Sequence, residues 1–181
     1  MSDLFSLAGR TALITGGSRG IGKMIAAGYI AAGAKVYISA RKEVACRQTA
    51  EELGCVALPA DVSTLEGIKA LAAAYRQHES KLDILVNNAG AAWLAPFDEF
   101  PEKGWDKVMD LNVKTPFYLT SEMAPELRAA ASFERPAKVI NIASIDGIAV
   151  NPQETYPYAA SKAGLIHLTR RMAKTLIADN I

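Results

Sequence analysis

A tyrosine and a lysine four residues apart are the side chains of this sequence best suited to acid–base chemistry. Tyr158 and Lys162 lie in the run Tyr-Ala-Ala-Ser-Lys, whereas Tyr156 has Ala160 at the same spacing. If the run is helical, the Tyr158 and Lys162 side chains share one face. A nearby ammonium favours the ionised phenol, so the pair is suited to moving a proton to or from a carbonyl or alcohol oxygen. The spacing alone is common and most often carries no function.

Other polar residues are expected close to this pair. Ser144 ends a predicted strand fourteen positions before Tyr158, where its hydroxyl could hydrogen-bond a substrate oxygen. The run Asn87-Asn88-Ala89-Gly90 closes the preceding strand, and Asn112 follows a helix that starts near Pro101. Open α/β sheets bind ligands in the crevice at the carboxyl ends of their strands. We therefore expect these residues to line one crevice.

A glycine-rich turn follows the first predicted strand, in the order Thr15-Gly16-Gly17-Ser18-Arg19-Gly20-Ile21-Gly22. Glycines at positions 16, 20 and 22 allow a tight turn, close approach of a pyrophosphate, and close packing of helix on sheet. The start of the next helix would present N–H groups and a positive dipole end to the phosphates. Many turns use glycine for geometry alone. Placed between a strand and a helix, however, this one predicts nucleotide binding, although its spacing is not Gly-x-Gly-x-x-Gly.

The end of the second predicted strand indicates which dinucleotide would bind. Proteins that bind NAD commonly have a carboxylate there for the ribose hydroxyls, but this chain has Ser39-Ala40-Arg41. A guanidinium can pair with a 2′-phosphate through two hydrogen bonds. Arg19 in the glycine turn could supply a second cation. The two arginines together favour NADP(H), the alternative being that both are solvated surface charges.

The elements that must position these residues alternate between strand and helix. Short apolar runs predict strands at 11–15, 35–39, 55–60, 82–87 and 138–144. Helical periodicity separates them and is clearest in the last segment, at Leu165, Leu168, Met172 and Leu176. Ser63 and Glu66 form a predicted capping box for the helix after the third strand. The order predicts an α/β fold of Rossmann type, a doubly wound parallel sheet with helices on both faces, over one domain at 1–181.

Composition excludes several classes of protein. Of 181 residues, 50% are hydrophobic and 22% charged, which fits one globular domain. A net charge of +1 without a basic stripe argues against nucleic-acid binding. No apolar stretch reaches the roughly 20 residues that span a bilayer, and no leader is recognisable, so we expect a cytoplasmic protein without a membrane partner. Two cysteines and two isolated histidines predict no metal site, and no Gly-x-Ser-x-Gly elbow indicates a hydrolase.

Together, these motifs resemble the short-chain dehydrogenase/reductase family. The likeness lies in the Thr-Gly-x-x-x-Gly-Ile-Gly turn, Asn-Asn-Ala-Gly, Asn112, and Ser144 ahead of Tyr-x-x-x-Lys, in that order. It implies that Tyr158 is the acid/base and that Lys162 promotes loss of the phenol proton while holding the nicotinamide ribose. It further implies that Ser144 orients the substrate oxygen and that Asn112 holds the water of a proton relay.

The resemblance also implies the contacts of the cofactor. Asp61 and Val62 would pack against adenine, although Asp61 could equally be a turn acid ahead of Ser63. Asn88 to Gly90 would line the adenosine side. The expected binding set is Gly16, Ser18, Arg19, Gly20, Ile21, Gly22, Arg41, Asp61, Val62, Asn88, Ala89, Gly90, Tyr158 and Lys162.

The expected function is transfer of a hydride between NADP(H) and a carbonyl or secondary alcohol. Trp93, Ile145, Ile148 and Val150 would flank the substrate and suggest a ketone with an apolar body. The chain is similar to bacterial 3-oxoacyl-thioester reductases, including the rhamnolipid-associated type, but sugar and polyol dehydrogenases share its motifs. Family members usually continue with further strands, so we expect this chain to be a fragment of a longer enzyme. The alternative to a reductase is a nucleotide-binding sensor without catalysis. The intact enzyme is expected to be a homodimer or homotetramer.

Overall fold

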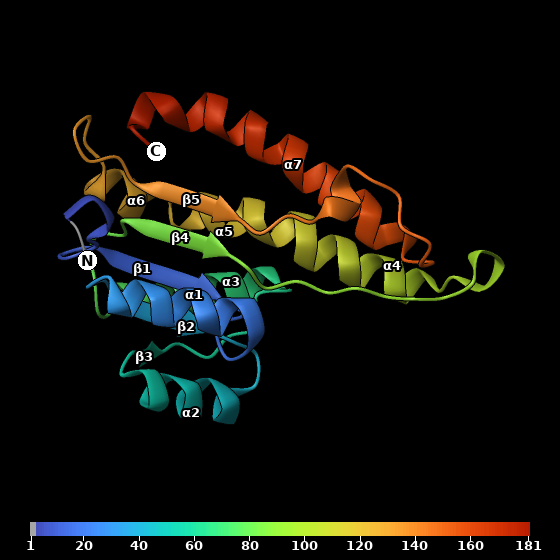
Figure 1. The fold of residues 1–181 in the computed structure, drawn as a ribbon, viewed down its shortest axis with the longest axis horizontal. Helices are drawn as coiled ribbons and strands as arrows, with labels where there is room; N and C mark the ends of the chain where they lie inside the picture. The colour runs from blue at the N-terminus through green and yellow to red at the C-terminus, as the bar shows by residue number, and fades with distance from the viewer. Residues whose placement is uncertain (1–2) are drawn as a thin grey trace.

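Five parallel strands form one sheet in the order β3-β2-β1-β4-β5 in the computed structural model, which describes residues 3–181 (Figure 1). The strands are β1 (Thr11–Thr15), β2 (Lys35–Ser39), β3 (Val56–Ala57), β4 (Ile84–Asn87) and β5 (Lys138–Asn141). The chain crosses from β3 on one side of β1 to β4 on the other, so the strand order reverses beside β1. In open sheets this reversal creates the crevice in which ligands bind. The predicted doubly wound α/β fold is confirmed.

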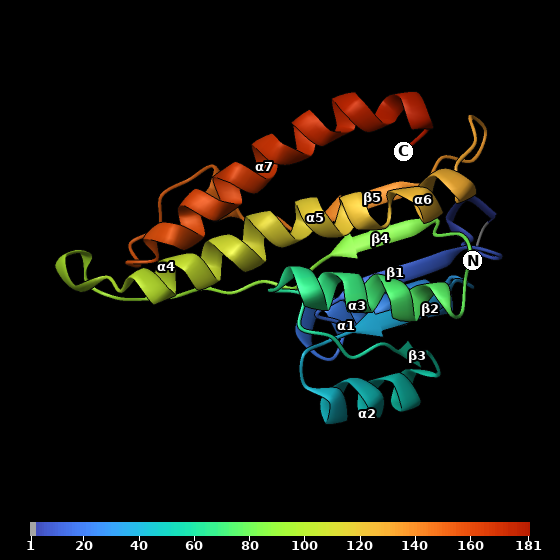
Figure 2. The ribbon, with the colours of Figure 1, turned by 180° about the vertical axis from the view of Figure 1, so that it is seen from behind.

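Helices cover both faces of the sheet, as the alternating pattern predicts. α1 (Gly20–Ala31) lies in front of the strands in Figure 1, and α3 (Leu65–Arg76) lies in front of them in the reverse view of Figure 2. The remaining helices are α2 (Glu43–Leu53), α4 (Glu102–Met109), α5 (Thr115–Glu122), α6 (Ala124–Ala130) and α7 (Tyr156–Leu176). No helix within residues 3–181 has the length and apolar character needed to span a membrane.

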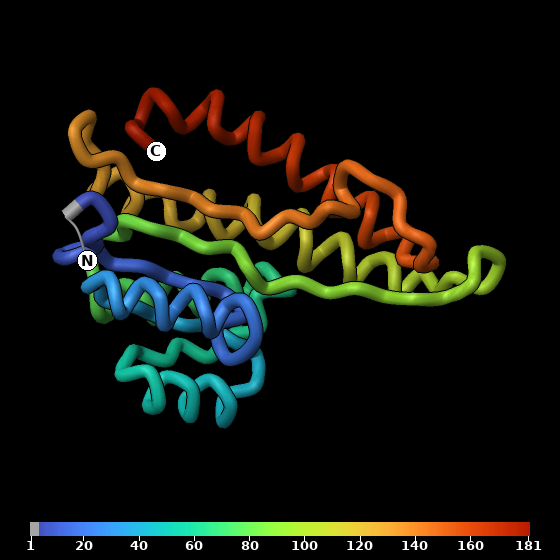
Figure 3. Tube along the Cα trace, viewed as in Figure 1, coloured from blue at the N-terminus to red at the C-terminus, as the bar shows by residue number. Residues whose placement is uncertain are grey.

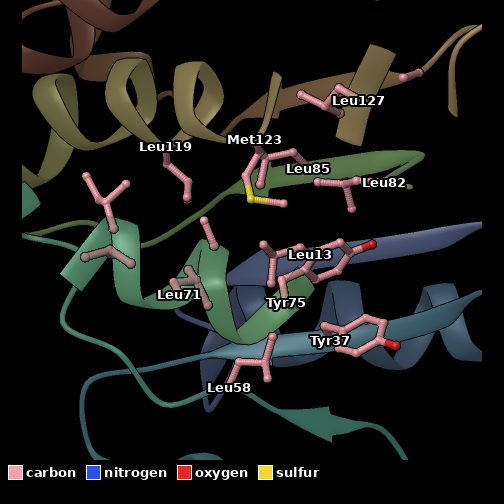
Figure 4. Close-up of a cluster of buried hydrophobic side chains, with 14 residues drawn as sticks. Leu13, Tyr37, Leu58, Leu71, Tyr75, Leu82, Leu85, Leu119, Met123 and Leu127 are labelled. Carbon is pink, nitrogen blue, oxygen red and sulfur yellow. The ribbon is translucent and has the colours of Figure 1, made fainter. Parts of the chain in front are cut away.

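Two apolar cores result from the alternation of side chains along the buried strands. On β1, Leu13 belongs to the core that Leu71, Leu119 and Met123 share with the sheet (Figure 4). Its neighbours Ala12 and Ile14 belong to the second core, on the side of α1 and α2. Because both faces of β1 are covered, the strand needs a continuous apolar sequence rather than an alternating one.

A long helical rod follows the segment after β4. It consists of α4, a π-helical turn called η3 (Asp110–Lys114) and α5, which run on without a break (Figure 3). Its start agrees with the prediction, because Pro101 is the residue immediately before α4. In Figure 1, α4 and the first half of α7 extend past the arrowheads at the carboxyl ends of the strands. π-Helical turns within helices frequently occur at functional sites.

Some strands are shorter than predicted. β3 covers only Val56–Ala57 rather than 55–60, and the run at 82–87 becomes a strand only from Ile84. Beyond β3, the Leu58 and Ala60 amides still donate to Ile38 and Ala40 of the neighbouring segment. Pro59 lies between these two donors, where the N–H of an edge strand points away from β2, so its missing N–H costs no bond to β2 and the pairing continues past β3. β5 ends at Asn141 rather than at 144, although the Ile142 amide still donates to the Asn87 carbonyl.

The predicted capping box is wrong. Thr64 caps α3, and its hydroxyl oxygen accepts a hydrogen bond from the Gly67 amide at 3.0 Å. Ser63 instead donates both its amide and its hydroxyl to the Asp61 carboxylate, at 3.1 and 2.7 Å. The carboxylate is a stronger acceptor than a hydroxyl and draws Ser63 into a turn one residue before the helix.

Candidate active site

The glycine turn between β1 and α1 is closely packed against its own backbone. Gly16 and Gly20 have φ of +66° and +53°, values that glycine adopts without strain. A Cβ on Gly22 would collide with the Gly16 carbonyl oxygen and would lie 2.5 Å from Asn88 Nδ2. Glycine is therefore required at position 22 for α1 to start this close to the sheet, as the sequence predicted.

The residues after β4 hold this turn in place. The Asn88 side-chain amide donates to the carbonyls of Thr15, at 2.9 Å, and Gly16, at 3.2 Å. In return the Thr15 hydroxyl oxygen accepts hydrogen bonds from the Asn88 and Ala89 amides. Asn88 and Ala89 thus lie against the glycine turn, where they were expected. Thr15 was not among the predicted site residues, and its place directly before Gly16 is the signal that could have identified it.

Two arginines border the glycine turn on the β2 side. The Gly17 amide donates to the Ser39 carbonyl, which brings the end of β2 against the turn. Arg19 and Arg41 flank this junction in the sequence, are exposed, and have no ion-pair partner within residues 3–181. The Ser39 hydroxyl is buried there without a hydrogen-bond partner among those residues. Unpaired cations beside a buried hydroxyl are features that suit an anionic ligand group.

Asp61 and Val62 follow β3 and open the way into α3. The Asp61 carboxylate is occupied by Ser63, as the turn-acid alternative predicted. Val62 is buried, and its carbonyl accepts a hydrogen bond from the Thr115 hydroxyl at 2.6 Å. Both residues therefore have structural roles. That they also contact adenine stays a prediction.

Ser144, Tyr158 and Lys162 are brought together by the packing of α7 against a short turn, η4 (Ile145–Gly147). A Cβ on Gly147 would lie 2.8 Å from the Lys162 carbonyl carbon, so the turn and the helix are in close contact. Ser144 caps the turn by accepting a hydrogen bond from the Asp146 amide at 3.2 Å. The Ser144 hydroxyl proton consequently remains available to a ligand oxygen.

Lys162 is the buried cation of this group. Its side chain is on a residue only 6% exposed, and Nζ donates to the Ile142 carbonyl at 2.6 Å. Nζ also lies 5.6 Å from the centre of the Tyr158 ring. Burial lowers the pKa of the Lys162 ammonium from its usual value. The Tyr158 hydroxyl has no hydrogen-bond partner within the described chain, so the two side chains meet through the ammonium and the aromatic ring rather than through a hydrogen bond.

Asn112 lies in the π-helical turn and is almost fully buried. Its oxygen accepts from the Ala91 amide at 2.8 Å, and its Nδ2 donates to the Ala91 carbonyl at 2.9 Å and to Ser161 Oγ at 3.0 Å. The side chain therefore links the segment after β4 to α7, between Tyr158 and Lys162 in the sequence. These three hydrogen bonds give Asn112 a role in positioning the two segments. That Asn112 also holds the water of a proton relay stays a prediction.

Gly90 lies between these groups. A Cβ on Gly90 would be 3.2 Å from Asn112 Oδ1 and 4.0 Å from Lys162 Nζ. The Asn-Asn-Ala-Gly run therefore touches the glycine turn with its second residue and the Lys162 region with its last. Ser161, which sequence reasoning did not select, donates to the Tyr158 carbonyl at 2.8 Å. Gly90 thus connects the residues around the glycine turn with those around Lys162, and binding of a ligand along them stays a prediction.

The apolar flank expected for a substrate stays a prediction. Ile145, Ile148 and Val150 expose most of their side chains close to Ser144 in the chain. Trp93 instead packs on α4, because a Cβ on Gly104 would meet the indole ring at 2.8 Å and Lys107 Nζ lies 5.3 Å from the ring centre. Because Gly104 has no side chain, it leaves space for the indole ring on α4. The sequence around Trp93 did not indicate this contact.

A phosphate-type glycine turn and a Ser, Tyr and Lys set at one edge of a doubly wound sheet define a nucleotide-dependent oxidoreductase scaffold. Residues 10–181 match the short chain dehydrogenase family. The chain therefore belongs to the short-chain dehydrogenase family, which its motifs resemble.

Several relatives are similar over the whole chain. A rhamnolipids biosynthesis 3-oxoacyl-[acyl-carrier-protein] reductase of Pseudomonas aeruginosa is 49% identical, and the match covers 100% of this chain and 72% of the relative. A 5-keto-D-gluconate 5-reductase of Escherichia coli is 37% identical, over 100% and 71% of the two chains. A solved Pseudomonas aeruginosa RhlG/NADP active-site complex has a TM-score of 0.98 at 49% identity and covers 100% of this chain and 72% of that one. These relatives are thus longer than the present chain.

Proposed function

We propose that this chain reduces a carbonyl group with NADPH, and that Tyr158 supplies the proton. The observation that carries the proposal is the Asn-Asn-Ala-Gly run, in which Asn88 braces the glycine turn while Gly90 lies next to Lys162 Nζ. A nucleotide held at the turn would then extend along this run toward Tyr158 and Lys162. The RhlG relative, whose solved structure contains NADP, supports this assignment.

The described residues divide the work of carbonyl reduction. Ser144 donates a hydrogen bond to the carbonyl oxygen, because its hydroxyl accepts from the Asp146 amide and its proton has no acceptor among the described residues. Tyr158 transfers its phenol proton to that oxygen as negative charge develops there. The Lys162 ammonium beneath the ring stabilises the phenolate that remains and offers donors to the cofactor ribose. The reduced nicotinamide, when bound, supplies the hydride that forms the new C–H bond.

The substrate that the site favours is a 3-oxoacyl thioester. Ile145, Ile148 and Val150 present apolar surface next to Ser144, which suits an alkyl chain and offers no donors for sugar hydroxyls. The name of the Pseudomonas aeruginosa relative, a 3-oxoacyl-[acyl-carrier-protein] reductase, agrees with this choice. The gluconate-type relatives, at 34 to 37% identity, make a sugar acid the alternative substrate class.

Exchanging two residues after β2 should change the preferred cofactor. In the double variant Ala40→Asp with Arg41→Ser, a 2′-phosphate loses its guanidinium partner and meets a carboxylate. We expect the ratio of kcat/KM for NADPH to that for NADH, measured with a 3-oxoacyl thioester, to fall about 100-fold, as for the loss of one charged hydrogen-bonded pair.

A neighbouring arginine provides the control for this exchange. Arg47 is exposed on α2 but pairs with Glu43 at 2.8 Å, so Arg47→Ser should leave the cofactor ratio unchanged. An unaltered ratio in the double variant would remove Arg41 from the cofactor site. A lack of turnover in the unmodified chain with either cofactor would overturn the proposed activity itself.

A further inference from the structure

A row of hydrogen-bonded polar side chains connects the sheet to the part of α7 that follows Lys162. Asn87 and Asn141 are paired across β4 and β5, and Asn87 Nδ2 donates to Asn141 Oδ1 at 2.8 Å. Asn141 Nδ2 then donates to Thr169 Oγ1 at 2.9 Å, and the Thr169 hydroxyl donates to the Leu165 carbonyl at 2.7 Å. The family motifs account for Asn87 alone, so the contact between Asn141 and Thr169 needs its own explanation.

Lys162 is hydrogen-bonded to the residue that directly follows β5. Its Nζ donates to the carbonyl of Ile142, the residue directly after Asn141, at 2.6 Å. The Ile142 amide in turn donates to the Asn87 carbonyl at 3.0 Å. Thr169 follows Lys162 by seven residues, which is about two helical turns, so both side chains leave α7 on its sheet-facing side. Two neighbouring residues of one segment therefore hold α7 at two points.

Apolar packing leaves the second half of α7 weakly supported. A groove of about 310 Å³ between α5 and α7 is open to solvent and is lined by Phe117, Leu168 and Met172 among others, and a smaller one of about 70 Å³ borders Asn141 and Thr169. Side chains along an open groove lack packing partners on that side. Between residues 166 and 176, Thr169 makes the one side-chain hydrogen bond from α7 to another element among the described residues.

We propose that Asn141 and Thr169 are positioning residues for Lys162, and that their hydrogen bond sets the distance of α7 from the end of β5. With an open groove bordering this contact, the helix can shift when the bond is lost. The Lys162 ammonium then no longer reaches the Ile142 carbonyl in the observed geometry. As far as turnover is concerned, the inference rests on the proposed function, but the position of Lys162 is open to a direct measurement.

The experiment compares how fast Lys162 is acetylated by a limiting amount of acetic anhydride, measured by mass spectrometry with exposed Lys69 as the internal reference. We expect Thr169→Val to raise the relative rate at Lys162 about five-fold, as for the loss of one net hydrogen bond. Thr169→Ser keeps the hydroxyl and should restore the original rate. Thr175→Val is the matched control, because the Thr175 hydroxyl bonds only within α7, to Arg171.

Denaturant unfolding of each variant separates positioning from mere stability. A lower free energy of unfolding in Thr169→Val with unchanged acetylation of Lys162 would overturn the proposal. If Thr169→Val does not fold, Thr169→Ala against Thr169→Ser makes the same comparison, since alanine leaves room for water beside Asn141. If the unmodified chain has no turnover, the proposed function fails, while the acetylation rates still decide the position of Lys162. If the unmodified chain does turn over, the variants with the faster acetylation of Lys162 should have the lower kcat.

Discussion

Replacing Tyr158 by phenylalanine is expected to lower the rate of carbonyl reduction by about three orders of magnitude, the upper range for loss of a general acid. The substitution removes one oxygen that has no hydrogen-bond partner within the described residues, so the fold should be unaffected. Binding of NADPH should persist, because the Gly22 turn and the Arg41 side chain are distant in the chain and unchanged. The measurement is kcat with a 3-oxoacyl thioester, together with the dissociation constant for NADPH.

The neighbouring tyrosine is a matched control for this prediction. Tyr156 lies on the same helix but donates its hydroxyl to Glu154 at 3.0 Å and packs its ring against Phe97 and Phe100. Tyr156→Phe should therefore keep turnover within about two-fold, since it loses only an exposed hydrogen bond. Comparable rates for Tyr158→Phe and Tyr156→Phe would refute the role assigned to Tyr158.

Gly22→Ala is expected to produce the largest loss of cofactor affinity of any single methyl addition. The new Cβ would collide with the Gly16 carbonyl and crowd Asn88 Nδ2, so the glycine turn must open. Opening displaces the backbone amides that would bind the pyrophosphate. We expect the dissociation constant for NADPH to rise about 100-fold, as for the loss of one strong charged hydrogen bond or two weaker ones. Fluorescence titration of the folded variant measures it.

The control for this change lies on the same helix. Gly28 is in α1 as well, and a Cβ there meets nothing within 4 Å. Gly28→Ala should leave NADPH affinity unchanged and should stabilise the helix by about 1 kcal/mol, since alanine favours helix over glycine. If the two alanine variants bind NADPH alike, the glycine turn is not where the pyrophosphate binds.

The fold could be predicted because its signal is spread over many residues. The runs 11–15 and 35–39 each have consecutive apolar residues at their centre, Ala12 to Ile14 and Val36 to Ile38, as a strand covered on both faces requires. The exact ends were less predictable, since β3 keeps strand geometry only over Val56–Ala57 and the Asp61 carboxylate takes Ser63 away from the helix cap. These outcomes depend on which of several local acceptors is nearest, and that is decided by tertiary structure.

The site could be predicted as a set of residues but not as a set of contacts. Spacing placed Tyr158 and Lys162 on one helical face, and the strand ends placed Gly90 and Ser144 beside them. The partners that hold these residues were out of reach, because Ile142 acts through a backbone carbonyl and Asn112 bonds to residues distant in the sequence. Trp93 also looked available for a substrate until the space above Gly104 was known.

Titration of the 181-residue chain with NADPH and with NADH is the most direct test of the account. The two tryptophans of the chain provide the fluorescence signal, and emission of the bound nicotinamide gives a second one. The account predicts saturable binding that is tighter for NADPH than for NADH, because Arg19 and Arg41 have no ion-pair partner among residues 3–181 and Ser39-Ala40-Arg41 at the end of β2 contains no acid. Equal affinity for the two cofactors, or no saturable binding of either, would contradict it.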